Sequence, residues 1–216
     1  MLERSLKKII NDWLSSIEGK KNSGALVLEN APGLLKILQQ SPYASRLLEL
    51  AIDGCQKSLR KDSGMFFTPG RAAAFMVRNA LQLWRKEHLT LSELQAIRIL
   101  DPACGNGEFL LAALDELLEI RKKLEPDIPE KNLILSIIKN NLFGIDCDKN
   151  VLDLLIKRLE LRSDSAINRK NFVHCNALDF SNASECFGGR KFDLVIGKYI
   201  SKVFELIPEM LRMTHS

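Results

Sequence analysis

From residue 96 onward, short apolar runs alternate with longer amphipathic stretches, and this alternation limits the folds that are open to the chain. Four of the apolar runs have the length of buried strands: Ile97–Leu100, Leu142–Ile145, Phe172–Cys175 and Phe192–Ile196. Three of the stretches between them have helical spacing: Glu108–Leu124, Asn132–Asn140 and Val151–Arg162. Strands that alternate with helices form βαβ units and a parallel sheet. The sequence therefore predicts an α/β fold that binds ligands at the carboxyl ends of its strands.

The first ninety residues have a different pattern, without a convincing strand. Apolar residues recur there at helical spacing, and a strong helix is expected from about Arg71 to Arg85, after Thr68-Pro69-Gly70. We expect an N-terminal helical region over residues 1–90 that packs on a Rossmann-like domain over residues 91–216.

Composition narrows the class of protein. A chain of 216 residues with 46% hydrophobic and 27% charged residues is typical of a globular protein. It has no apolar run of about eighteen residues and no secretory signal, so we expect no membrane contact and a cytoplasmic location. The five cysteines lack paired spacing, which favours a reducing compartment and predicts no metal site. The net charge of +4 permits a polyanionic partner without requiring one.

Polar landmarks follow the predicted strands. Asp101 ends the first strand, and Gly105 and Gly107 lie in the turn that opens the next helix. Glycines there let the backbone approach a ligand, and the exposed N–H groups face a negative or electron-rich group. Asp146 ends the second strand, where an acid accepts hydrogen bonds from ribose hydroxyls in dinucleotide-type folds. Asp179 lies just past the third strand, where a carboxylate would accept a hydrogen bond from an adenine amino group.

Several of these residues have simpler interpretations. Any one of the acids alone is more often a helix cap or a solvated residue, and for Asp148 a cap and a ligand role are equally weighted. We interpret His174 as a core or edge residue and Cys104 as a small packing residue. The basic run Arg158–Arg162 is interpreted as a solvated helix face that could touch phosphates. The order of acids and glycines at successive strand ends favours a nucleotide-type site.

Ile99–Leu110, with the sequence Ile-Leu-Asp-Pro-Ala-Cys-Gly-Asn-Gly-Glu-Phe-Leu, resembles the first motif of adenine-N6 DNA methyltransferases of the gamma-type arrangement. These include modification subunits of type I restriction systems and fused type II enzymes. Gly64–Pro69 is similar to the segment that precedes this motif and covers the methionine end of the cofactor. Leu142–Asp148 resembles the second motif, and Asn176–Phe180 resembles the third.

The resemblance implies a Rossmann-like methyltransferase fold and S-adenosyl-L-methionine as the cofactor. The cofactor-binding residues that it implies are Phe67, Thr68, Pro69, Asp101, Ala103, Gly105, Gly107, Asp146, Cys147, Asp179 and Gly197. The family's sheet has seven strands, so the parallel sheet is expected to be incomplete at the C-terminus, from truncation or from missing residues.

The resemblance also implies methylation of an adenine flipped out of double-stranded DNA, in a restriction–modification system, with a specificity or restriction subunit as a further partner. The family places Asn-Pro-Pro-Tyr after the fourth strand, to bind the adenine amine. Here Gly197 is followed by Lys198-Tyr199-Ile200. Tyr199 is either a remnant of that motif or part of a helix over residues 198–212, which we favour. No catalytic residue is assigned, and we expect little or no methyl transfer from this polypeptide.

Two other functions are compatible with the same motifs. One is methylation of RNA or of a protein glutamine, because those families share the first three motifs. The other is a catalytically dead scaffold that binds S-adenosylmethionine, which the missing Asn would explain.

Overall fold

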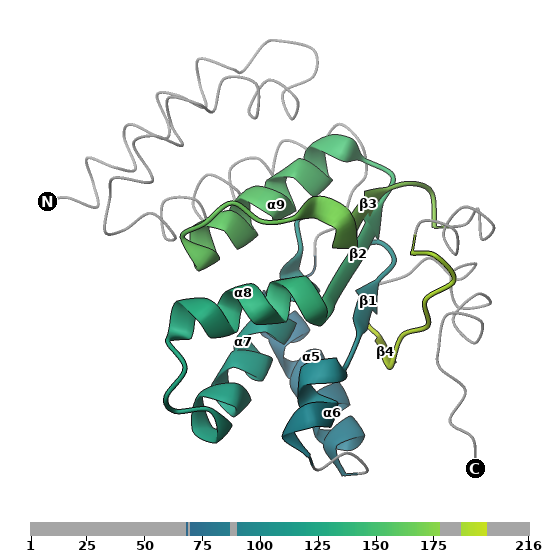
Figure 1. Ribbon diagram of the computed structural model, residues 1–216. Coiled ribbons are helices and arrows are strands. Elements are labelled where there is room, and N and C mark those ends of the chain that lie inside the picture. Colours follow the sequence, from purple (N-terminus) through teal and green to yellow (C-terminus); the bar gives the residue numbers. More distant parts are fainter. Residues whose placement is uncertain (1–67, 69, 87–89, 178–186, 198–216) are drawn as a thin grey trace, which may run out of the picture. The chain divides into compact units, whose positions relative to one another are not determined.

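The computed structural model describes residues 68, 70–86, 90–177 and 187–197, all of which belong to a compact unit that begins at Thr68. Figure 1 shows this unit as a sheet with helices stacked beside it. The helices expected before residue 68 and over residues 198–212 lie outside the described residues, as do Phe67, Pro69, Asp179 and Tyr199.

The described strands form one parallel sheet. They are β1 (Ile99–Asp101), β2 (Leu142–Asp146), β3 (Phe172–His174) and β4 (Leu194–Val195). Their order in space is β3-β2-β1-β4, and β1 pairs in parallel with both β2 and β4. A short 3-10 helix, η1 (Arg169–Asn171), leads into β3. The predicted α/β class with a parallel sheet is confirmed, and each strand falls within two residues of its predicted bounds.

The described helices are α5 (Gly70–Arg85), α6 (Leu91–Ala96), α7 (Glu108–Leu124), α8 (Glu130–Asn140) and α9 (Lys149–Ser163). Four of them match predicted helices, and α7 has the predicted bounds. Helix α6 was not predicted. It begins with a capping box, in which the Glu93 N–H donates to Thr90 Oγ1 at 3.2 Å and the Thr90 N–H donates to Glu93 Oε2 at 2.9 Å.

The sheet has an apolar layer on each face. Ile99 and Leu142 belong to the core beneath α5, α7, α8 and α9. Leu100 and Phe143, one position further along their strands, belong to a second cluster with Phe187 and Phe192, as expected when successive side chains point to opposite faces. In this second cluster the ring centroids of Phe143 and Phe192 lie 5.2 Å apart, edge to face. Strands buried on both faces are typical of parallel sheets.

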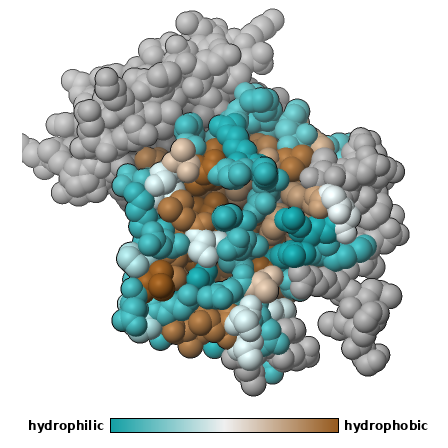
Figure 2. Space-filling model, in the orientation of Figure 1, coloured by the Kyte–Doolittle hydropathy of each residue, from teal (hydrophilic) through white to brown (hydrophobic). Residues whose placement is uncertain are grey.

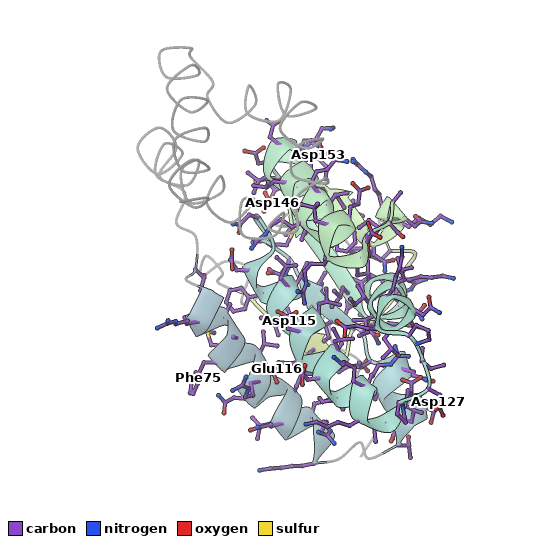
Figure 3. The ribbon with its side chains drawn as sticks, turned by 90° about the vertical axis from the view of Figure 1, so that its left-hand side faces the viewer. Phe75, Asp115, Glu116, Asp127, Asp146 and Asp153 are labelled. Carbon is purple, nitrogen blue, oxygen red and sulfur yellow. The ribbon has the colours of Figure 1, made fainter. Side chains whose placement is uncertain are left out.

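Helix α5 shares the core of the sheet domain. Ala73, Val77 and Leu81 are buried, and the Arg78 guanidinium donates to Glu116 of α7, with Nη2 2.6 Å from Oε1. Phe75, which is 70% exposed, points away from the core, whereas Glu116 lies on the side of α7 that faces α5 (Figure 3). Helix α5, which the sequence analysis assigned to the N-terminal region, thus packs in the same core as the sheet. The domain boundary near residue 90 stays a prediction.

A buried asparagine joins α6 to the sheet. Asn141, fully buried before β2, donates through Nδ2 to the carbonyl oxygens of Gln95 at 3.1 Å and Ile97 at 2.7 Å. The backbone carbonyl oxygen of Asn141 accepts from the Ile99 N–H at 2.8 Å. Because these bonds satisfy the end of α6 and the start of β1 together, they fix where β1 begins relative to β2.

On the helical face, hydrophilic residues surround smaller hydrophobic areas (Figure 2). Among the described residues, none of the helices has the length and apolar character needed to cross a membrane.

Candidate functional site

The site lies where the order of the strands reverses. From β1 the chain moves outward to β2 and β3, then returns to the other side of β1 as β4. Strand β1 is therefore flanked by β2 on one side and β4 on the other, and in open α/β sheets ligands bind in the crevice at such a switch point. The Ile196 N–H donates to Leu100 O at 2.9 Å, which places Gly197 beside the carboxyl end of β1. This position follows from topology, independently of any motif.

The turn from Asp101 to Gly107 is held by a succession of hydrogen bonds. The Ala103 N–H donates to Asp101 Oδ1 at 3.2 Å, and the Cys104 N–H donates to Ile145 O at 2.9 Å. The Gly105 N–H donates to Asp146 Oδ2 at 2.7 Å, and the Gly107 N–H donates to Cys104 O at 2.8 Å. Two of these bonds cross to β2. The structure thus brings together the glycine turn and the second acid predicted from the sequence.

Gly107 meets both a conformational and a packing requirement. Its φ of 89° lies in the left-handed region, which side chains rarely adopt. A Cβ atom on Gly107 would lie 2.2 Å from Leu155 Cδ1 of α9. Gly107 is also the N-cap of α7, which has no side-chain capping bond, so first-turn N–H groups remain for other acceptors.

Asp146 is bonded through both carboxylate oxygens. Oδ2 accepts from Gly105, and Oδ1 accepts from the Asp148 N–H at 2.9 Å. Each oxygen has a further lone pair, and the residue is half-buried, so it can still accept from a ligand hydroxyl. Asp148 caps α9 through Oδ1, which accepts from the Asn150 N–H at 2.8 Å and the Val151 N–H at 3.4 Å. Of the two roles weighed for Asp148, the structure favours the cap.

Burial sets the protonation of the innermost groups. Asp101 is 1% exposed, and this burial raises its pKa to about 8, with the nearby Asp146 carboxylate contributing in the same direction. Burial also raises the pKa of the Cys104 thiol. A thiol that stays protonated is a poor nucleophile, in agreement with the packing role expected for Cys104.

Of the remaining predicted residues, Ala103 and Gly105 follow β1, Cys147 follows β2 and Gly197 follows β4. Ala103 and Cys147 are exposed, and Thr68, Gly105 and Gly197 are half-buried. Phe67, Pro69 and Asp179 are not among the described residues. His174, at the exposed end of β3, has Nε2 3.0 Å from the Cys147 carbonyl oxygen. Within the described ranges, no group of three or more His, Cys, Asp or Glu could hold a metal ion.

Sequence reasoning missed an ion pair directly behind the glycine turn. Arg158 of α9 donates through Nη1 to Asn106 O and to Glu108 Oε1, each at 2.8 Å. The side chains of Arg158 and Glu108 are only 12% and 18% exposed. The interpretation of Arg158 as part of a solvated helix face was therefore wrong. Its position beside Leu155 and Leu159, which lie on the buried face of α9, is the signal that could have placed it inward.

Comparison with known proteins finds similarity to DNA methyltransferases over part of the chain. Residues 78–180 match the family model described as the DNA-methyltransferase domain of MmeI. This range contains the Asp101 turn, Asp146 and Asp179. The chain is 47% identical over 77 residues to a protein of Methanocaldococcus jannaschii assigned as a type II restriction enzyme and methyltransferase. It is 31% identical over 84 residues to a type II restriction enzyme and methyltransferase of Heyndrickxia coagulans.

The matched segments cover 33% and 39% of this chain but only 6% and 12% of the two relatives. Among solved structures, the chain is similar to the modification subunit assigned to a type I restriction enzyme of Vibrio vulnificus. That similarity has 18% identity and a TM-score of 0.47, and it covers 76% of this chain and 35% of that one. The resemblance to methyltransferases of restriction–modification systems is confirmed by the family model and the two curated relatives.

Proposed function

We propose that the chain binds S-adenosyl-L-methionine and forms the cofactor-binding part of an adenine-N6 DNA methyltransferase of a restriction–modification system. The observation that carries the proposal is the bond from the Gly105 N–H to Asp146 Oδ2 at the switch point of the sheet. That bond fixes a glycine turn and a carboxylate side by side. The DNA-methyltransferase family match over residues 78–180 supports the same reaction class.

The donor and acceptor groups at this edge suit the parts of the cofactor. Asp146 retains lone pairs for ribose hydroxyls, and the turn at Gly105 and Gly107 lets the backbone approach closely. Asp101 is the first residue of the turn, and a positively charged ligand group near it would favour the ionised form of its carboxyl group, against the burial that raises its pKa. In this proposal Thr68, Ala103, Cys147 and Gly197 line the rim of the pocket, and Phe67, Pro69 and Asp179 complete it. The cofactor supplies an activated methyl group on its sulfonium.

Double-stranded DNA with a flipped adenine is the proposed substrate, and a specificity or restriction subunit is a proposed partner. Methyl transfer itself has weaker support. Lys198-Tyr199-Ile200 stands where the resemblance implies Asn-Pro-Pro, so acceptors for the adenine amine are absent from that position. This observation favours a second candidate function, a scaffold in the cytoplasm that binds the cofactor without turnover.

Two measurements on the full chain test these proposals. Calorimetric titration with S-adenosylmethionine is expected to show one site per chain, and no binding would refute the cofactor proposal. Incubation with methyl-labelled cofactor and adenine-containing duplex DNA is expected to leave the DNA at background label. Labelled DNA would instead establish the enzyme, and labelled RNA or protein with unlabelled DNA would refute the proposed substrate.

A further inference from the structure

Arg158 and Glu108 form a partly buried ion pair that contacts the glycine turn at Asn106. Arg158 lies in the third turn of α9, whereas Glu108 is the first residue of α7. The Arg158 Nη1 atom reaches the Glu108 carboxylate and the Asn106 carbonyl oxygen, both at 2.8 Å. Such charge-assisted bonds are stronger and more directional than neutral ones.

The Asn106 carbonyl belongs to the peptide between Asn106 and Gly107, the second of the two peptides that separate Gly105 from Gly107. That peptide's N–H group, on Gly107, donates to Cys104 O at 2.8 Å. Its oxygen, held by Arg158, points the other way. With both ends bonded, the peptide plane cannot rotate freely, although Gly105 and Gly107 have φ values of 54° and 89° and could adopt many others. Arg158 therefore restricts the part of the turn that glycine leaves most free.

Glu108 extends the same contact to two neighbouring segments. Asn106, which is 2% exposed, donates through Nδ2 to Glu108 Oε1 at 3.3 Å. On the other side, Glu108 Oε2 lies where a Cβ atom on Gly70 would be 3.0 Å away. Gly70 is the first residue of α5 and follows directly on Thr68-Pro69. The Glu108 carboxylate thus lies between α9, the glycine turn and the start of α5.

We propose that Arg158 is a positioning residue for cofactor binding, acting through Asn106 and Glu108 to hold the Gly105–Gly107 turn in its binding conformation. This inference rests on the proposed function. Buried ion pairs add little stability on average, and their best-attested role is to specify one arrangement over others. The expected consequence of losing Arg158 is a turn that samples several conformations, and hence a weaker affinity for S-adenosylmethionine.

A matched control lies one helical turn further along α9. Arg162 also pairs with an acid of α7, Asp115, but the two side chains are 40% and 57% exposed and contact no residue of the turn. Arg158→Gln and Arg162→Gln therefore remove the same charge from the same helix and differ in their contact with the turn. Arg158→Lys keeps the charge but loses the planar guanidinium.

The experiment uses the full chain and two readouts, at a temperature where circular dichroism shows each variant to be folded. Calorimetry with S-adenosylmethionine measures affinity, and hydrogen exchange measures protection of peptides that cover residues 101–109. Arg158→Gln is expected to weaken affinity about tenfold and to speed exchange in those peptides. Arg158→Lys is expected to have an affinity and an exchange rate between those of Arg158→Gln and the unchanged chain. Arg162→Gln is expected to keep an affinity within about twofold of the unchanged chain.

Equal affinity and exchange in Arg158→Gln and Arg162→Gln would overturn the positioning role. If the unchanged chain binds no cofactor, the proposed function fails, and exchange in the turn alone then decides whether Arg158 holds it. If Arg158→Gln does not fold, Glu108→Gln replaces it. That variant keeps the bond from Arg158 to Asn106 O, so a smaller increase in exchange over residues 101–109 is expected, and no increase would refute the proposal.

Discussion

The described part of the structure has two turns that contain pairs of glycines, one directly after β1 and one before β4, and the surroundings of the two turns differ. The turn after β1 contains Gly105 and Gly107, whose N–H groups are both bonded, and Gly107 packs against Leu155 so closely that it leaves no room for a side chain. The turn before β4 contains Gly188 and Gly189, also with positive φ, but a Cβ atom on either would meet nothing within 4 Å. In the first turn a glycine is packed against another element, whereas in the second the described residues leave open space around both glycines.

The same contrast extends to what each region can do. The ends of β1 and β2 are tied together through Gly105 and Asp146, and their residues suit a cofactor. Strand β4 has two half-buried residues, and the sequence after Gly197 lacks the acceptors expected for an adenine amine. In the proposed function, cofactor binding depends on residues at the β1–β2 edge, whereas methyl transfer depends on residues after β4. The two activities can therefore be lost separately.

The largest expected effect concerns the buried carboxyl group of the β1–β2 edge. Burial raises the pKa of Asp101 from 3.8 to about 8, so the folded chain holds a proton that the unfolded chain releases between these values. Stability from this group is complete below pH 3.8 and is lost as pH rises through 8. Between pH 5 and pH 8 this group lowers the free energy of unfolding by about 4 kcal/mol, and Asp101→Asn should abolish that decrease. Urea unfolding of both chains at pH 5 and pH 8 measures it, and an equal difference at both pH values would contradict the assignment.

The next effect tests Asp146 as the ribose acceptor. Asp146→Ala removes the acceptor for ligand hydroxyls and for the Gly105 N–H, so affinity for S-adenosylmethionine should fall about a hundredfold, or about 3 kcal/mol. Asp153→Ala is the control, because Asp153 lies on α9 and pairs with Lys149 and Arg169, away from the turn. In Figure 3 the two acids lie at different heights along this part of the molecule. Calorimetry that found the same affinity in both variants would remove Asp146 from the site.

The smallest effect tests the comparison of the two turns directly. Gly107→Ala introduces a Cβ atom into the space of Leu155 at a φ of 89°, and should cost about 2 kcal/mol of unfolding free energy. Gly189→Ala has a similar backbone requirement but open space around it, so about 1 kcal/mol is expected. Denaturant unfolding of both variants compares them. Equal losses would show that backbone conformation alone, without packing, distinguishes Gly107.

The sequence predicted those parts of the fold that depend on local pattern. The bounds of α7 were correct because a glycine turn precedes it, a proline follows closely, and its apolar spacing is regular. Helix α6 was missed because six residues are too few to show a helical period, and its capping box was not recognised. The residues at the strand ends were found because parallel strands bring their carboxyl ends to one edge whatever their spacing in sequence.

What the sequence could not predict depends on contacts between distant residues. Arg158 lies 50 residues from Glu108, and although its position beside Leu155 and Leu159 could have suggested burial, the sequence does not show which residue it pairs with. For Asp148, a cap and a ligand role use the same carboxylate, and only the observed bonds to Asn150 and Val151 separate them. The pKa of Asp101 likewise depends on how deeply its side chain is buried, which cannot be deduced from the sequence alone.

Asp146 and Arg158 lie on β2 and on the helix that follows it, α9, so the glycine turn cannot be moved to another protein without them. The motif that identifies the pocket is contiguous, from Asp101 to Phe109, but its shape is held from outside, by Asp146 at the end of β2 and by Leu155 and Arg158 of α9. Grafting the nine motif residues onto another sheet would transfer the sequence motif without the residues of β2 and α9 that hold its conformation. The smallest portable unit is the whole β1-α7-α8-β2-α9 segment.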